Sequence, residues 1–331
     1  MAKIKAVITS TGSYFPPKVV DNHFFESYLD TSDEWITTRT GIKTRRFAGD
    51  GVGTSDMAVE AARDALNRRG MSPDEVECII VATVSPDMHF PQTACLVQDK
   101  LGARNAWGFD LSAACSGFVF AYVTACNLIE SGRFKNVLLI GADKCSSFIN
   151  MEDRNTCVLF GDAAGAVLIE PEEDSEYGFV DCDLHIDGSG GKYLYMPAGG
   201  SLKPASEETV KNKEHYVFQE GREVFKRAVV KMPESTKKVL EKVGLEVEDI
   251  DWLVPHQANI RIIESVAKRL KIDKNKVMLN IHKYGNTTAA TIPTCIDEYY
   301  KKGELKKGQT VVITSFGAGF TWGAALLKWG I

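Results

Sequence analysis

The sequence lacks the features that mark several common classes of protein. In its 331 residues, no apolar run approaches the roughly 18 residues that a membrane-spanning helix needs. None of its 8 cysteines forms a CxxC pair, and most lie in apolar runs, where a reduced thiol acts as a small hydrophobic side chain. We therefore expect a reducing, cytoplasmic environment, no metal site and no contact with a membrane.

The sequence also lacks an excess of positive charge. Its 39 basic and 44 acidic residues give a net charge of −5, so nothing favours general binding to nucleic acid. The N-terminal residues carry two lysines but neither a long apolar segment nor a cleavage site, and we expect no secretion. No G-x-G-x-x-G motif follows an expected strand, which argues against an NAD-dependent dehydrogenase.

What the sequence does contain is a regular alternation of helix and strand patterns. Thr54 and Ser55 are expected to cap a helix that ends at Gly70. The segments that follow read as a strand at 78–84, a helix after Pro91, a strand toward Leu111, an apolar helix over 115–129 and a strand at 137–140. Short apolar strands between helices predict an α/β fold whose sheets are covered on both faces.

The second half of the chain repeats this order. Residues 65–81 align without gaps with residues 239–255, and the same offset of 174 places Val137 on Val311. Element order also relates the corner at Cys115 to the corner at Asn286. We predict a duplicated chain with halves at 1–173 and 174–331, the acidic segment 170–176 as the seam, and a ligand site between the halves.

Cys115 is the first candidate for chemistry. It lies in DLSAACSGF, after an expected strand and at the start of an apolar helix. Unpaired N–H groups and the positive end of the helix dipole favour a thiolate there, and the small neighbouring residues leave room for a substrate. The ordinary alternative is a small cysteine packed into the core.

Two further corners carry polar groups. His256, in WLVPHQAN, lies just past a buried strand, and strand ends face the ligand crevice in α/β sheets. Asn286 follows Gly285 in KYGNTTAA. Taken singly, the histidine reads equally well as a structural residue and the asparagine as a helix cap. The glycine-rich segment 315–323 follows a strand and offers either close backbone N–H groups or a simple turn.

Together a cysteine, a histidine and an asparagine on separate corners predict acyl transfer. A thiolate attacks an acyl carbonyl, and the other two groups manage the charge that develops. Papain-like proteases use the same residue types, but their C-G-[SA]-C-[WY] context is absent.

These motifs resemble the β-ketoacyl-[acyl-carrier-protein] synthase III family over essentially the whole chain. The resemblance rests on TSDEWITTRTGI, DLSAACSGF, LFGDAAGA, PHQANIRI, YGNTTAA and FGAGFTWG. It implies a thiolase-like fold of five αβαβα layers built from two similar halves, and a homodimer. It also implies that a short acyl group, such as acetyl, passes from coenzyme A to Cys115 and is then condensed with malonyl-acyl carrier protein, with no cofactor.

The resemblance assigns roles to individual residues. His256 and Asn286 would donate hydrogen bonds to the malonyl thioester as it loses carbon dioxide, and the backbone N–H groups of Cys115 and Ala318 would form an oxyanion hole. Many relatives have glycine at the position of Ala318. The expected coenzyme A contacts are Thr31, Trp35, Arg39, Arg154, Gly221, Phe225 and Asn259, with Trp35 and Arg154 sandwiching the adenine. Arg222 stands where some relatives carry asparagine.

The acyl pocket and the carrier-protein surface follow in the same way. Phe160 and Phe90 would line the acyl pocket, with Phe90 either reaching across a dimer or packing in its own core. Helix 261–271 buries an apolar stripe and turns Arg261, Lys268 and Arg269 outward. With Lys226 these residues would dock the acidic carrier protein, although a charged helix face is often only solvated.

Two rival functions stay open at this level. A type III polyketide synthase or a secondary-metabolite synthase of the same fold would share the Cys-His-Asn set and differ in its starter and in the number of extensions. A non-catalytic acyl-CoA-binding protein would not become acylated at Cys115. The TSDEWITTRTGI motif and the short chain favour the priming enzyme.

Overall fold

The computed structural model describes residues 3–331. The strands are β1 (Ile4–Tyr14), β2 (Lys18–Asp21), β3 (Thr44–Phe47), β4 (Cys78–Ala82), β5 (Trp107–Leu111), β6 (Val137–Asp143), β7 (Ala163–Glu173), β8 (Gly178–Ile186), β9 (Leu194–Tyr195), β10 (Phe218–Gln219), β11 (Trp252–Pro255), β12 (Thr310–Gly317) and β13 (Thr321–Lys328). The α-helices are α1 (Asn22–Glu26), α2 (Asp33–Thr40), α3 (Thr54–Arg69), α4 (Thr93–Leu101), α5 (Gly117–Glu130), α6 (Glu207–Lys211), α7 (Gly221–Glu241), α8 (Ile260–Leu270), α9 (Ile281–Tyr284) and α10 (Thr291–Lys301).

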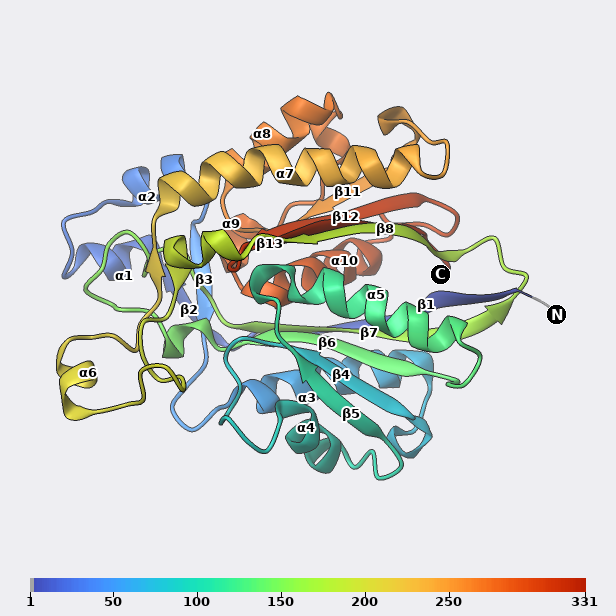
Figure 1. Cartoon of the computed structure of the whole chain (residues 1–331), viewed down its shortest axis with the longest axis horizontal. Helices are drawn as coiled ribbons and strands as arrows, with labels where there is room; N and C mark the ends of the chain where they lie inside the picture. The colour runs from blue at the N-terminus through green and yellow to red at the C-terminus, as the bar shows by residue number, and fades with distance from the viewer. Residues whose placement is uncertain (1–2) are drawn as a thin grey trace.

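Two sheets divide the molecule into layers (Figure 1). One sheet has the order β1-β7-β6-β4-β5 and the other the order β11-β12-β13-β8. Helices α3 and α4 cover the outer face of the first sheet, α7 packs on the outer face of the second with α8 beside it, and α5 and α10 lie between the sheets. The five-layered α/β arrangement expected from the sequence is therefore confirmed.

The parallel strand pairs of the two sheets have the same register. Cys78 of β4 pairs with Val137 of β6 in parallel, and Trp252 of β11 pairs with Val311 of β12 in the same way, 174 positions later. In each sheet the next two strands are antiparallel. The strand β5 has no full counterpart, because only an isolated bridge joins Leu253 to residue 277. The register supports the predicted halves 1–173 and 174–331, whose boundary stays a prediction.

The middle layer also repeats at the same offset. A 3₁₀ turn, η2 (Ala114–Ser116), precedes α5, and a second, η7 (Thr288–Ala290), precedes α10. Their first residues both adopt left-handed backbone, with φ 49° at Ala114 and 48° at Thr288. A non-glycine residue holds this conformation only when its surroundings enforce it. The duplication thus extends to the backbone of the two corners that the sequence singled out.

The helix predicted after Ser55 shows one correction. Helix α3 ends as expected, with Gly70 in left-handed conformation at φ 71°. Its N-cap, however, is Gly53, whose N–H donates to Asp56. The hydroxyl of Thr54 donates instead to the Ser85 carbonyl, and that of Ser55 to Asp87. These side chains tie the helix to the loop after β4, a tertiary contact that local sequence does not reveal.

The helices owe their positions to apolar stripes that face the sheets. In α8 the buried residues Ile262, Ile263, Val266 and Leu270 pack into the core between this helix, α7 and the second sheet, as the periodicity predicted. Burying each such side chain contributes about 1.5–3 kcal/mol. Within residues 3–331, no helix combines the length and the apolar character needed to cross a membrane.

Candidate active site

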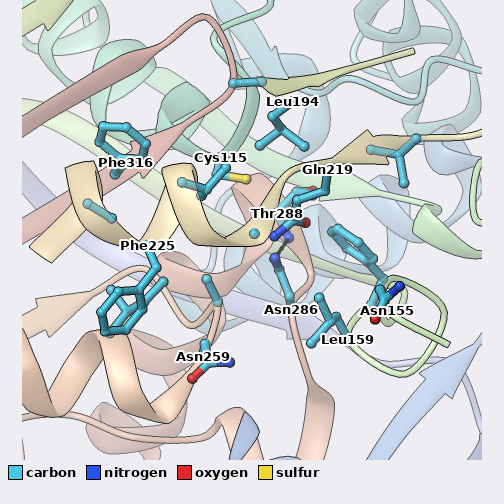
Figure 2. A pocket seen from close by; sticks show the side chains of 18 of the residues that line it. Cys115, Asn155, Leu159, Leu194, Gln219, Phe225, Asn259, Asn286, Thr288 and Phe316 are labelled. Carbon is cyan, nitrogen blue, oxygen red and sulfur yellow. Dashed lines mark hydrogen bonds between the residues drawn. The ribbon is translucent and has the colours of Figure 1, made fainter. Parts of the chain in front are cut away.

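A single cavity of about 750 Å³ brings together residues from both halves. Cys115, His256, Asn286 and Ala318 line it, together with Trp35, Arg39 and Arg261. Figure 2 shows the Cys115 sulfur, the Asn286 amide and Thr288 facing the same space. Side chains far apart in the sequence therefore share one cavity, as the sequence predicted.

Cys115 lies in the turn η2, two residues before α5 begins. It is 9% exposed. Burial raises the pKa of the thiol to about 12, and the nearby Asp143 carboxylate adds to the rise. The sequence suggested that the helix N-terminus would favour a thiolate. In the structure the loss of hydration acts in the opposite direction and disfavours the thiolate.

His256 follows β11 directly, and its ring is buried. Its backbone N–H donates to the Thr314 carbonyl at 2.8 Å, which fixes the residue to β12. Nδ1 lies 2.7 Å from Oγ1 of Thr291, and Nε2 has no partner among residues 3–331. Burial lowers the pKa of the imidazole to about 3, so the ring is neutral. One nitrogen is thus anchored and the other left for a ligand.

Asn286 is held by its backbone and by its own side-chain oxygen. Its N–H donates to the Leu159 carbonyl at 2.8 Å, and Oδ1 accepts the N–H of Thr288 at 2.9 Å. Because the oxygen is occupied in this way, the amide nitrogen Nδ2 is the side-chain atom turned to other partners. A neutral N–H donor in a buried cavity suits a carbonyl oxygen that gains negative charge.

Asp143 accepts hydrogen bonds from the loop after β4 and from the turn η7 that follows Asn286. It is fully buried at the end of β6 and accepts hydrogen bonds from the Thr83 and Ser85 hydroxyls and from the N–H groups of Val84 and Ser85. Its second oxygen accepts from the hydroxyl of Thr288 and the N–H of Ala289. The carboxylate therefore holds the η7 turn against the first sheet.

The β12–β13 hairpin closes the other side of Cys115. A Cβ placed on Gly317 would lie 2.8 Å from the Cys115 nitrogen, so only glycine permits this approach. The hydroxyl of Ser315 donates to the Cys115 carbonyl at 2.8 Å, and that of Thr321 to the Ala113 carbonyl at 2.9 Å. The hairpin thereby brings the backbone of Ala318 to the cavity wall.

Trp35 lines the cavity, and two arginines lie on its ring. The guanidinium of Arg39 lies 4.3 Å from the centre of the Trp35 ring, and that of Arg154 lies 4.9 Å from it. Arg154 also donates to the Asp30 carbonyl, next to Thr31. A flat aromatic ring with arginines on it is a surface on which a nucleotide base stacks.

Comparison with known proteins gives the family. The model of the 3-oxoacyl-[acyl-carrier-protein] synthase III family matches residues 109–188, and the model of its C-terminal part matches residues 240–329. The β-ketoacyl-[acyl-carrier-protein] synthase III of Caldanaerobacter subterraneus is 54% identical, covering 99% of this chain and 98% of that protein. The chain belongs to the β-ketoacyl-[acyl-carrier-protein] synthase III family.

Two further relatives agree with this assignment. The synthase III of Koribacter versatilis is 54% identical and covers 98% of each chain. The crystal structure of the synthase III from Aquifex aeolicus is 45% identical, with a TM-score of 0.90, and covers 98% of this chain and all of that chain. The family is one of condensing acyltransferases, which makes this protein an enzyme of that class with a thiolase-like fold.

Most of the coenzyme A contacts expected from the family line the cavity, and two do not. Gly221, Phe225, Asn259 and Phe160 line the cavity with Trp35 and Arg39, whereas Thr31 and Arg154 do not. Arg222, the departure noted from the sequence, also lines the cavity. Asn259 has a second role, because its side chain caps α8 by accepting the N–H of Arg261 at 2.8 Å.

Phe90 does not line this cavity. It is 84% exposed, so the alternative of ordinary packing in its own core is wrong for this chain. Of the basic residues predicted to dock the carrier protein, Arg261 lines the cavity and Lys226, Lys268 and Arg269 are exposed on α7 and α8. The structure therefore leaves all four basic side chains accessible.

Sequence reasoning missed the residues that support the site. Thr288, Thr291 and Asp143 carry the hydrogen bonds that position Asn286 and His256. A signal existed for Thr288 and Thr291, since three threonines follow Asn286 within five residues. Asp143 has no such signal. Its importance lies in contacts with residues 145 positions away.

Proposed function

We propose that the enzyme condenses a short acyl-CoA with malonyl-acyl carrier protein to give 3-oxoacyl-acyl carrier protein, the step that primes fatty acid synthesis. Family membership supports this reaction. The observation that carries the residue assignments is the single cavity that joins Cys115, His256 and Asn286 to the aromatic and cationic surface at Trp35.

In the first half-reaction the sulfur of Cys115 attacks the thioester carbonyl of the acyl-CoA. A carbon–sulfur bond forms, coenzyme A leaves, and the thiol proton of Cys115 ends on the departing sulfur. The backbone N–H groups of Cys115 and Ala318 would stabilise the oxyanion, and the close packing of Gly317 on Cys115 supports that assignment. Because burial disfavours the thiolate, transfer of the proton is expected to accompany the attack.

In the second half-reaction malonyl-acyl carrier protein occupies the same cavity. Its carbon–carboxylate bond breaks, carbon dioxide leaves, and the electron pair passes into the thioester as an enolate. His256 and Asn286 would donate N–H groups to the enolate oxygen, and one such donor lowers the barrier by about 3–4 kcal/mol. The enolate carbon then attacks the Cys115 thioester and the sulfur leaves. The thioester carbonyl accepts the electrons, so we expect no cofactor.

Coenzyme A would enter past the residues at the outer part of the cavity. Its adenine is expected to stack between Trp35 and Arg154, with Thr31 and Arg39 nearby. Arg154 lies on the Trp35 ring, so it would shift to admit the base. The pantetheine arm would follow Gly221, Phe225 and Asn259 toward Cys115. The acyl group itself would lie against Phe160.

The carrier protein would dock on the basic residues of α7 and α8. Lys226, Lys268 and Arg269 are exposed there, and Arg261 stands at the cavity wall. Replacing Arg261 with alanine should raise the KM for malonyl-acyl carrier protein several-fold, and the effect should shrink as salt increases. A KM that stays at the wild-type value at low salt would remove this docking proposal.

We also expect a cytoplasmic homodimer. The ring of Phe90 is 84% exposed and is therefore accessible to a partner chain. In a dimer, Phe90 would reach the partner's acyl pocket. Sedimentation or light scattering on the whole protein would test the oligomeric state.

The function is tested by incubating the protein with acyl-CoA donors and measuring its intact mass. Acetyl-CoA should add one acetyl group to Cys115, and a C115A variant should gain none. Addition of malonyl-acyl carrier protein should then give a single condensation. Repeated extension on free coenzyme A would instead support the polyketide synthase, and binding without acylation would support the non-catalytic protein. Replacing Asn286 with alanine should slow condensation about 100- to 1000-fold, with a smaller effect on acylation.

A further inference from the structure

The hydroxyl of Thr291 links the two sides of the proposed decarboxylation site. Thr291 begins α10 and is 1% exposed. Its Oγ1 lies 2.7 Å from Nδ1 of His256 and 3.0 Å from the carbonyl oxygen of Thr288. Thr288 in turn donates its N–H to the Asn286 side chain. A single hydroxyl therefore touches the histidine and the turn that positions the asparagine.

The direction of this hydrogen bond decides what His256 can do. The ring is neutral, so one of its nitrogens carries a proton and the other does not. If Thr291 donates to Nδ1, the proton of the ring is on Nε2, which is then a donor. If Nδ1 donates to Thr291, the hydroxyl donates to the Thr288 carbonyl, and Nε2 is only an acceptor.

The surroundings favour the first arrangement. The Thr288 carbonyl already accepts the backbone N–H of Thr291, which closes the η7 turn, so it does not require the hydroxyl as a second donor. The hydroxyl has one proton and two acceptors within reach, Nδ1 at 2.7 Å and the Thr288 carbonyl at 3.0 Å, so that carbonyl is the competing acceptor. No other side chain in residues 3–331 is recorded as a hydrogen-bond partner of the ring. Thr291 is thus the group that sets where the imidazole proton lies.

We propose that Thr291 is a positioning residue that donates its hydroxyl proton to Nδ1 of His256 and thereby keeps the imidazole proton on Nε2, ready for the enolate oxygen. This inference rests on the proposed role of His256 and adds a residue that does not touch the substrate. It also explains why a hydroxyl occupies a fully buried place beside the ring, where a buried polar group needs a partner.

Thr288 and Asp143 fix the position of Thr291 through two hydrogen bonds. The Thr288 hydroxyl donates to the Asp143 carboxylate, and the Thr288 carbonyl accepts the Thr291 N–H. The same turn therefore orients both proposed hydrogen-bond donors, Asn286 directly and His256 through Thr291. A neighbouring threonine offers a matched control. The buried hydroxyl of Thr294, one turn further along α10, donates to the carbonyls of Ala290 and Thr291 at 2.7 and 3.2 Å and is not bonded to His256.

The first test reads the tautomer in the unaltered protein. With ¹⁵N-labelled histidine, nitrogen NMR distinguishes a protonated from an unprotonated ring nitrogen, and the signals of His256 are assigned by their loss in a H256Q variant. We expect the proton on Nε2. A proton on Nδ1 in the wild-type protein overturns the proposal, and this measurement needs no substitution at Thr291.

The second test separates the two half-reactions. Replacing Thr291 with valine keeps the shape and removes the hydroxyl. We expect decarboxylation of malonyl-acyl carrier protein to slow about 10- to 100-fold with little change in KM, and acylation of Cys115 to change much less. Thr291→Ser, which restores the hydroxyl, should recover most of the rate. Thr294→Val should leave both half-reactions near the wild-type rates.

The outcomes also separate this inference from the proposed function. If the wild-type protein neither acylates Cys115 nor releases carbon dioxide, the proposed function fails whatever Thr291 does. If the wild type is active but the valine variant decarboxylates at nearly the wild-type rate, only the inference fails. It fails too if valine and serine at position 291, or valine at position 294, slow the reaction equally, since the effect would then be one of packing.

Discussion

The turns η2 and η7 occupy equivalent places in the two halves and carry different chemistry. Each is a 3₁₀ turn before a middle-layer helix, and each begins with a left-handed residue, Ala114 or Thr288. At the next position one has Cys115 and the other Ala289. The duplicated backbone therefore supplies two similar corners, of which one bears the nucleophile and the other orients hydrogen-bond donors.

Each turn is held by the opposite half of the molecule. The hydroxyls of Ser315 and Thr321 bind the carbonyls of η2 and its neighbour, whereas Asp143 binds the side chain and backbone of η7. Asp143 and Gly317 lie 174 positions apart, at the ends of the equivalent strands β6 and β12 of the two sheets. The Asp143 carboxylate thus holds the turn η7, and Gly317 leaves space for the backbone of Cys115.

The largest expected effect comes from moving the nucleophile between the two turns. Replacing Cys115 with alanine should reduce condensation by at least about 10⁴-fold, because no other thiol is expected to form the acyl-enzyme. Adding Ala289→Cys should not restore activity, since Ala289 does not line the cavity. Intact mass after incubation with acetyl-CoA measures this result. Acetylation at position 289 would show that the two turns are chemically interchangeable.

The second prediction concerns the ionisation of the nucleophile in η2. Because burial raises the pKa of Cys115 to about 12, the thiolate fraction should rise about tenfold per pH unit between about pH 6 and pH 9. The rate of Cys115 alkylation by iodoacetamide, followed by peptide mapping, should rise with it. Glutathione serves as the reference thiol. A rate that levels off below pH 8 would mean that the helix N-terminus outweighs burial after all.

The third prediction exchanges the small residue that faces η2. In Gly317→Ala the new Cβ would meet the Cys115 nitrogen at 2.8 Å, so the hairpin or the turn must shift. A displacement of about 1 Å at a reacting group can cost about 100-fold in rate. We expect acylation of Cys115 to slow accordingly, measured as the pre-steady-state rate with acetyl-CoA. Gly188→Ala, where a Cβ meets nothing within 4 Å, is the matched control.

The smallest effect on chemistry and a clear effect on stability are expected at Asp143. Asn at this position would turn an amide NH₂ toward donors such as the Thr288 hydroxyl or the N–H of Ala289. Leaving buried donors unpaired should lower the free energy of unfolding by about 2–4 kcal/mol, measured in urea. Acylation of Cys115 should be less affected than decarboxylation. Equal losses in both half-reactions would show that Asp143 serves both turns alike.

Much of the fold followed from patterns within short segments. The strands at 78 and 137, the helix that ends at Gly70 and the apolar stripe of α8 are visible as periodicity and turn chemistry. The duplication was visible because two segments match at one offset. The prediction that Thr54 and Ser55 cap α3 was wrong, because their hydroxyls donate to the loop after β4 and not to their own helix.

The site was predictable to the extent that motifs carry it. Cys115 and His256 stand out by their positions after strands and Asn286 by the turn at Gly285, and family resemblance added the rest. Arg154 and Phe90 show the limit of this approach. Their family roles follow from alignment, but only coordinates reveal that Arg154 packs on Trp35 and that Phe90 is exposed.

The sequence by itself determined the alternation of helices and strands, the repeat and the candidate reacting groups, because these depend on local periodicity and on residue type. The five layers and the roles of the reacting groups came from its resemblance to the family. Only the tertiary structure decided how the groups behave. Burial of Cys115 against Asp143, and the single hydroxyl between His256 and Thr288, arise from residues that the chain separates and the fold brings into contact. Desolvation and hydrogen-bond direction depend on such neighbours in space, and sequence order does not contain them.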